Sequence, residues 1–173
     1  MTFKLMLRNF VGGPLTEAAP PVDDAALAEL AARVNQASRA RLGRTLSIRE
    51  VDAGSCNGCE LEIHALNNVL YDLERFGMRF VASPRHADVL LVTGPVTGNM
   101  REALERTYKA TPDPKWVVAV GDCARNGGVF AGSAACVGGV SAVLPVDLHI
   151  PGCPPSPVAL LKGLLALVEN VSK

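Results

Sequence analysis

The sequence has no excess of charge of either sign: its 173 residues include 17 lysines and arginines and 17 aspartates and glutamates. Proteins that bind nucleic acid or an anionic membrane surface usually carry a clear excess of basic charge. The balanced composition therefore argues against nucleic acid as a partner and favours other proteins.

Long hydrophobic runs are also missing. The most apolar late segment, PVALLKGLLALVEN, is interrupted by Lys162 and is shorter than the roughly 20 residues that a membrane span needs. The apolar N-terminal stretch is broken by Lys4, Arg8 and Asn9, which is not the pattern of a signal peptide. Five cysteines in such a chain indicate a reducing compartment, where thiols stay free to bind metals. We therefore expect a cytoplasmic protein.

From residue 46 onward, short apolar stretches alternate with helical patterns, which predicts an α/β fold with a parallel sheet covered by helices on both faces. Strands are expected at Leu46–Val51, Met78–Ala82, Asp88–Thr93, Trp116–Val120 and Val146–Ile150. Helices are expected at Glu60–Phe76, closed by Gly77, and at Gly98–Ala110 and Ser156–Asn170. The glycine-rich stretch GGVFAGSAACVGGV is expected to be a loop that carries a short helix.

The chain divides into three parts by composition. Residues 1–22 are an apolar arm and a glycine- and proline-rich linker, and we expect this arm to dock on a partner subunit. Residues 23–45 are expected to form a surface helix with a narrow apolar stripe at Leu27, Leu30, Ala31 and Val34. Residues 46–173 are expected to form the α/β domain itself.

Four of the five cysteines follow predicted strands. Cys56 and Cys59 lie in AGSCNGCELEI after the first strand, Cys123 follows the fourth in VVAVGDC, and Cys153 follows the fifth in DLHIPGC. Because the carboxyl ends of parallel strands meet at one edge of a sheet, we expect these thiols to gather there. Cys136 lies away from any predicted strand end and is expected to be a buried thiol.

The spacing of these cysteines leaves three occupants open. An iron-sulfur cluster and a zinc ion both accept four thiolates, whereas a disulfide redox cycle needs only the close pair. A structural zinc site usually combines two close pairs, but here the second and third cysteine turns are single and about 30 residues apart. The pattern therefore favours a 4Fe-4S cluster.

Three stretches in this order, GSCNGCELEI, VAVGDCARNGG and LPVDLHIPGCPPSP, resemble a known family. It is the small-subunit family that nickel-iron hydrogenases share with the B-type cluster subunit of respiratory complex I. The likeness covers roughly residues 46 to 170. The separated pair in CNGC is most similar to energy-converting, membrane-associated hydrogenases and formate hydrogenlyase-type complexes, since complex I subunits have two adjacent cysteines there.

The resemblance implies a flavodoxin-like fold and one proximal 4Fe-4S cluster bound by Cys56, Cys59, Cys123 and Cys153. It implies an electron-transfer subunit of an oxidoreductase complex, which is not catalytic alone. Its partners would be a hydrogenase-like or complex I-like large subunit and a ferredoxin-like iron-sulfur subunit. Membrane subunits would be contacted indirectly, which places the chain at the cytoplasmic face of the membrane.

Two alternatives stay open: a complex I-like quinone oxidoreductase module whose partner lacks nickel, and a zinc-stabilised structural subunit. Glu62, at the start of the predicted helix after Cys59, is a candidate for proton transfer or for the interface with the large subunit, because the resemblance places a glutamate there. Glu60, at the helix start itself, is expected to be a capping charge. His64 is expected to be a packed or solvated helical residue.

Overall fold

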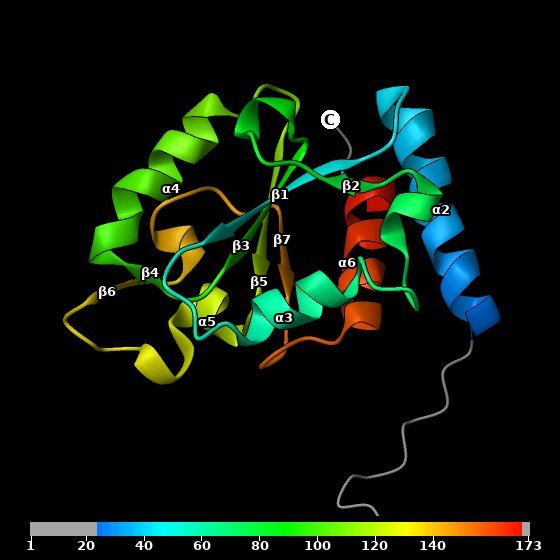
Figure 1. Ribbon diagram of the computed structural model, residues 1–173. Coiled ribbons are helices and arrows are strands. Elements are labelled where there is room, and N and C mark those ends of the chain that lie inside the picture. The colour runs from blue at the N-terminus through cyan, green and yellow to red at the C-terminus, as the bar shows by residue number, and fades with distance from the viewer. Residues whose placement is uncertain (1–23, 171–173) are drawn as a thin grey trace, which may run out of the picture.

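The computed structural model describes residues 24–170, which build a five-stranded parallel sheet flanked by helices (Figure 1). The strands lie in the order β2-β1-β3-β5-β7. Counted along the chain within this sheet, that order is 2-1-3-4-5, which is the flavodoxin-like arrangement. The predicted fold class is therefore confirmed. The bounds of these strands are β1 Ser47–Asp52, β2 Arg79–Phe80, β3 Val89–Thr93, β5 Trp116–Val120 and β7 Leu148–Ile150.

Helices cover both faces of this sheet. Every residue of β3 and β5 is buried, as is typical of central strands in a parallel sheet. Alternate side chains enter two separate cores, so that Leu91 packs on one face and Leu90 on the other. The first core is covered by α2 (Asp24–Leu42), α3 (Gly58–Ala65) and α6 (Pro157–Asn170), and the second by α4 (Gly98–Ala110) and α5 (Gly121–Asn126).

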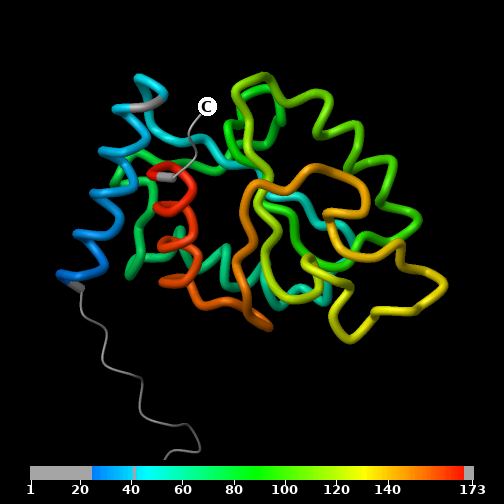
Figure 2. The backbone as a smooth tube through the Cα atoms, turned by 180° about the vertical axis from the view of Figure 1, so that it is seen from behind, coloured from blue at the N-terminus to red at the C-terminus, as the bar shows by residue number. Residues whose placement is uncertain are grey.

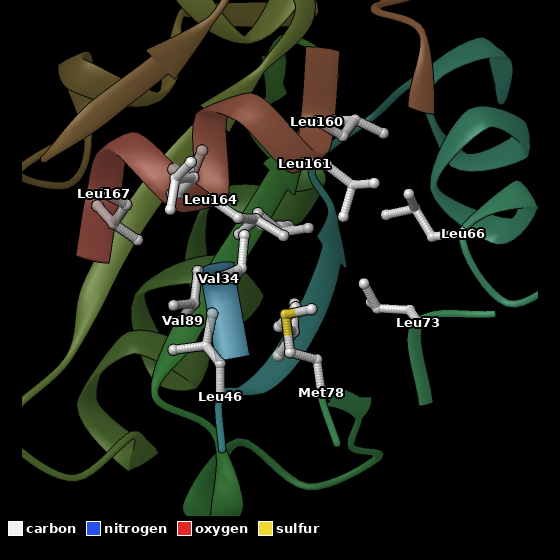
Figure 3. Packing of buried hydrophobic residues seen from close by; sticks show 14 of the residues in the cluster. Val34, Leu46, Leu66, Leu73, Met78, Val89, Leu160, Leu161, Leu164 and Leu167 are labelled. Carbon is white, nitrogen blue, oxygen red and sulfur yellow. The ribbon is translucent and has the colours of Figure 1, made fainter. Parts of the chain in front are cut away.

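The larger core lies between the sheet and the helices α2 and α6, which run side by side in both views of the backbone (Figure 1, Figure 2). Figure 3 shows Leu160, Leu161 and Leu164 of α6 directed towards Leu66 and Val34. The predicted apolar stripe of α2 contributes three fully or nearly fully buried side chains, at Leu27, Ala31 and Val34, while Leu30 is partly buried. The apolar stripe predicted from the sequence is therefore the face of α2 that packs into the larger core.

The single long helix predicted at Glu60–Phe76 is wrong. α3 ends at Ala65, and after a turn the chain forms only a short 3-10 helix, η1, at Leu73–Phe76. The Asn68 side chain accepts hydrogen bonds from the backbone N–H groups of Leu70 (2.9 Å) and Tyr71 (3.0 Å), which replaces the helical bonding pattern. The Asn68 side chain thus stabilises a turn at a place where the apolar pattern predicted a helix.

The glycine-rich stretch after β5 contains more structure than predicted. Short 3-10 helices, η3 at Gly128–Phe130 and η4 at Val140–Ala142, agree with the expected short helix. Between them, β6 (Cys136–Gly138) pairs antiparallel with β4 (Val96–Thr97), so this part of the predicted loop is a strand. Strands of two or three residues are too short to show the alternation that identifies a strand in a sequence. α5 was likewise not predicted.

Within residues 24–170, no helix is both long enough and apolar enough to cross a bilayer. The N-terminal arm that the sequence predicts to dock on a partner, residues 1–22, lies outside the described residues.

Candidate functional site

The four predicted ligands line one cavity of about 130 Å³ at the carboxyl edge of the sheet. Cys56 and Cys59 come from the loop after β1 and the start of α3, Cys123 lies in α5 directly after β5, and Cys153 follows β7. The cavity has mostly apolar and glycine walls, to which Gly94, at the end of β3, also contributes. The structure therefore brings together side chains that are up to 97 positions apart in the sequence.

The loop that carries Cys56 is held by the last residue of β1. The Asp52 carboxylate accepts hydrogen bonds of 2.7 Å from the backbone N–H groups of both Gly54 and Ser55. The Ser55 hydroxyl then accepts a bond from the Asn57 N–H at 3.1 Å, where the chain turns with a φ of +69° into α3. Each of these bonds fixes the backbone around Cys56, so Asp52 is a structural part of the site.

The other two cysteine turns are bonded to each other. The Asp122 N–H donates to the Gly152 carbonyl at 2.9 Å, and the Gly152 N–H donates to the Asp122 carboxylate at 3.1 Å. The His149 ring, on β7, contacts the Gly121 carbonyl through Nε2 at 3.1 Å. Cys123 and Cys153 therefore stand on turns that are fixed relative to one another. The sequence signal for Asp52 and Asp122 is an acidic residue immediately before a glycine- or cysteine-bearing turn, and sequence analysis did not use it.

Glycines are required where the backbone passes closest to the thiols. A Cβ atom on Gly121, whose φ is +85°, would lie 2.7 Å from the Cys59 sulfur. A Cβ atom on Gly128, whose φ is +52°, would lie 2.6 Å from the Cys123 sulfur. Any larger residue would have to displace a thiol, so these two positions preserve the geometry of the cavity.

The electrostatics of the cavity disfavour free thiolates. Burial raises the pKa of the Cys59 thiol to about 12, with further contributions from Glu60 and from the other three cysteines. Burial and the neighbouring Cys153 also raise the pKa of Cys123. Four negative sulfur atoms in so small a space need a compensating positive charge, which a bound metal group supplies while it displaces the thiol protons.

The four thiols are a donor set that fits a metal group. Thiolates bind both zinc and iron-sulfur clusters, and in a 4Fe-4S cluster each cysteine binds a separate iron atom. Here one close pair and two single cysteines line the same cavity, whereas a structural zinc site usually combines two close pairs.

Similarity to known proteins agrees with this arrangement. Residues 56–167 match the family model described as NADH ubiquinone oxidoreductase, 20 Kd subunit. This match begins at Cys56 and includes all four cysteines of the cavity. The chain belongs to this family.

Two curated relatives are named as subunits of a membrane-bound hydrogenase and of a formate hydrogenlyase. This chain is 47% identical, over 132 residues, to the probable membrane-bound hydrogenase subunit mbhJ of Pyrococcus furiosus, and the match covers 76% of this chain and 79% of the relative. It is 46% identical, over 133 residues, to formate hydrogenlyase subunit 7 of Escherichia coli, and that match covers 75% of this chain and only 52% of the relative. The resemblance inferred from the three cysteine motifs is confirmed.

Solved structures of oxidoreductase complexes also contain chains that resemble this one. A chain of the membrane-bound sulfane sulfur reductase, an archaeal respiratory membrane complex, is similar with a TM-score of 0.65 and 36% identity, covering 80% of this chain and 74% of that one. A chain of an NAD+-reducing nickel-iron hydrogenase has the same fold, with a TM-score of 0.58 and 22% identity, covering 75% and 94%. The relatives named here belong to oxidoreductase complexes, as the sequence predicted.

The remaining candidate residues do not line the cavity. Glu62 is half-buried on α3, and its expected interface or proton-transfer role stays a prediction. Glu60 lies in the first turn of α3, where a capping charge was expected, but it is only 7% exposed and its carboxylate oxygens have no hydrogen-bond partner among the described residues. Cys136 is half-buried in β6 and does not line the cavity.

Proposed function

We propose that this chain is the electron-transfer subunit of a multisubunit, membrane-associated hydrogenase and that it binds one proximal 4Fe-4S cluster. The cluster would be bound by Cys56, Cys59, Cys123 and Cys153. The observation that carries this proposal is the cavity itself, which is lined by four thiols from three separate turns. Zinc is disfavoured by the arrangement of one close pair and two single cysteines, because a structural zinc site usually combines two close pairs.

A 4Fe-4S cluster supplies reversible one-electron transfer. The chain supplies the site around it. Cys59 is half-buried in the first turn of α3, while Cys56 and Cys153 are exposed. The three cysteine turns follow β1, β5 and β7, so one sheet fixes where all three turns begin.

The surroundings of the cavity support a large subunit as the neighbouring partner. Leu61 on α3 is 63% exposed, and Val129 and Phe130 on η3 are 84% and 41% exposed. These apolar side chains lie within two residues of Cys59 or Gly128, and exposed apolar surface near a site marks a protein interface. In this proposal the large subunit holds the nickel-iron centre and covers this surface, with Glu62 at or near the interface.

The remaining partners follow from the same role. A ferredoxin-like iron-sulfur subunit would exchange electrons with this chain, and membrane subunits would be reached only through other subunits. The named relatives are a membrane-bound hydrogenase subunit and a formate hydrogenlyase subunit. In this proposal, the chain lies at the cytoplasmic face of the membrane.

The test is the metal content of the complex, purified without oxygen through a tag on this chain. We expect iron together with nickel, no stoichiometric zinc, and the electron paramagnetic resonance signal of a reduced 4Fe-4S cluster. The Cys123→Ser variant should lose this signal, whereas Cys136→Ser, which changes a thiol outside the cavity, should keep it. Zinc without iron would end the proposal.

A second candidate is a nickel-free, complex I-like module that passes electrons to quinone or another acceptor. The similarity to a chain of a sulfane sulfur reductase complex favours it. The Cys-x-x-Cys spacing favours the first candidate. Iron without nickel in the purified complex would support the second candidate and leave the cysteine site unchanged.

A further inference from the structure

A second cavity, of about 220 Å³, lies beside β1 on the side away from β3. It exists because β2 is only two residues long and pairs only with Ser47 and Ile48. The following residues, Arg49 and Glu50, therefore border a gap in the sheet, which is also lined by His64 of α3 and by Asn67 in the turn after α3. The cavity thus connects the middle of β1 with the exposed His64 side chain.

Polar atoms without partners face this gap. The Arg49 Nε and one Glu50 carboxylate oxygen are buried and have no hydrogen-bond partner among the described residues. Both residues line the cavity, so a donor and an acceptor are available there at the same time. A volume of this size holds several water molecules, at about 30 Å³ each, and buried polar groups are normally satisfied in this way.

Glu50 and the cysteine cavity share one charged neighbour. Glu60, the residue after Cys59, is buried, and neither of its carboxylate oxygens has a hydrogen-bond partner among the described residues. Glu60 raises both the pKa of Glu50 and the pKa of the Cys59 thiol. Both groups therefore interact with the same buried carboxyl group, in a poorly solvated region where charges act over longer distances than in water.

We propose that Glu50 is a proton-binding site that exchanges protons with solvent through the cavity beside His64 and takes up a proton when the cysteine site gains an electron. This inference rests on the proposed function. The electron comes from a redox partner of the complex and the proton from water. The carboxylate becomes a carboxylic acid, so the added negative charge is compensated, and reoxidation releases the proton again.

The surroundings of Glu50 raise its pKa, which is the direction that this role needs. Burial is the largest effect and raises its pKa, and Glu60 and Asp52 raise it further. His64 on α3 and Arg49 on β1 lower it. The net result is a carboxyl group with a raised pKa, whose protonation a nearby charge can change at a pH where an exposed carboxylate would stay ionised.

The test is a reductive titration of the intact complex, followed by the electron paramagnetic resonance signal of the cluster between about pH 5 and pH 9. In the wild type, the ratio of reduced to oxidised cluster at a fixed potential should fall as the pH rises, by up to about tenfold per pH unit over part of this range. In Glu50→Gln, which keeps the shape but not the titration, this ratio should be much less dependent on pH. Glu74→Gln removes the same charge from an exposed residue and should behave as the wild type.

Redox difference infrared spectra give a second readout. A carboxylic acid C=O band should appear on reduction of the wild type and be missing in Glu50→Gln. His64→Gln tests the same site through an exposed residue. Because His64 lowers the pKa of Glu50, its loss should move the pH-dependent range upwards.

The outcomes separate this inference from the proposed function. If the wild-type complex has no cluster signal, the proposed function fails. If the signal is present but has the same pH dependence in the wild type and in Glu50→Gln, only the role of Glu50 is overturned. An unchanged pH range in His64→Gln would overturn it as well.

Discussion

The core beneath α6 and the cysteine cavity lie on the same strands but are built in different ways. The core is made of leucines and valines that exclude water, such as Leu160, Leu161 and Leu164, all with no exposed surface. The cavity is made of short turns held by a few hydrogen bonds, with Cys56 and Cys153 exposed. The difference teaches that most of the stability comes from the core, whereas the shape of the cavity depends on a few residues of the turns.

The largest loss of stability is expected from the core. Leu164→Ala removes a fully buried side chain of α6 and should lower the free energy of unfolding by about 2–5 kcal/mol, because it leaves a cavity. Urea denaturation of the apo chain measures this. Lys162→Ala, an exposed change on the same helix, should stay within about 0.5 kcal/mol of the wild type. Equal effects of the two changes would remove the distinction between core and surface.

A glycine substitution tests whether the cavity can be damaged while the core is left intact. Gly121→Ala forces a Cβ atom to within 2.7 Å of the Cys59 sulfur, so iron binding should be lost. Gly132→Ala is a matched control, because its φ of +84° is close to the +85° of Gly121 but nothing lies within 4 Å.

Both glycine variants should lose about 1–3 kcal/mol of stability from backbone strain, and only Gly121→Ala should lose iron. The iron content of the purified complex and the unfolding curve of the apo chain decide this. Full iron content in Gly121→Ala would show that the close approach is not needed.

A smaller effect is expected from the bond between the two cysteine turns. Asp122→Ala removes the acceptor of the Gly152 N–H, which should cost about 1 kcal/mol in the apo chain. Asp122→Asn keeps an oxygen at this position and should recover most of that stability. Denaturation curves of both variants give the answer, and identical losses would exclude the hydrogen bond as the cause.

The smallest effect is a change in how stability depends on pH. In the folded chain the pKa of Glu50 is raised above its ordinary value of 4.5. At a pH between the ordinary pKa and the raised pKa, the folded chain keeps a proton that the unfolded chain has lost. The free energy of unfolding should therefore fall as pH rises through this window.

Glu50→Gln should lack this component, while Glu74→Gln should keep it. Denaturation of the apo chain at a series of pH values measures the slopes. A slope in Glu50→Gln equal to that of the wild type would show that burial does not affect this carboxyl group.

Much of the fold could be predicted from the sequence, because the central strands are continuous apolar runs and the helices have their own periodicity. The strand Trp116–Val120 and the helix Gly98–Ala110 have the bounds that were expected. The predicted helix beyond Ala65 was wrong because the Asn68 side chain bonds the backbone locally, an effect that an apolar pattern does not contain.

The candidate site was predictable in part for the same reason. The carboxyl ends of parallel strands lie at one edge of the sheet, so the meeting of these cysteines in one cavity could be expected from the common direction of the strands. The environment of Glu50 could not, since it depends on β2 ending after two residues and on the depth of Glu60. Such features arise from three-dimensional packing.

If the proposed function holds, the reciprocal bonds between Asp122 and Gly152 also bear on the speed of electron transfer. A group bound to Cys123 and Cys153 would rest on two turns that are bonded to each other, each at the end of a strand of the same sheet. These bonds would oppose any shift of the two sulfur atoms when the oxidation state changes. A site held in this way would keep the reorganisation energy low, so that little nuclear rearrangement accompanies each electron that enters or leaves.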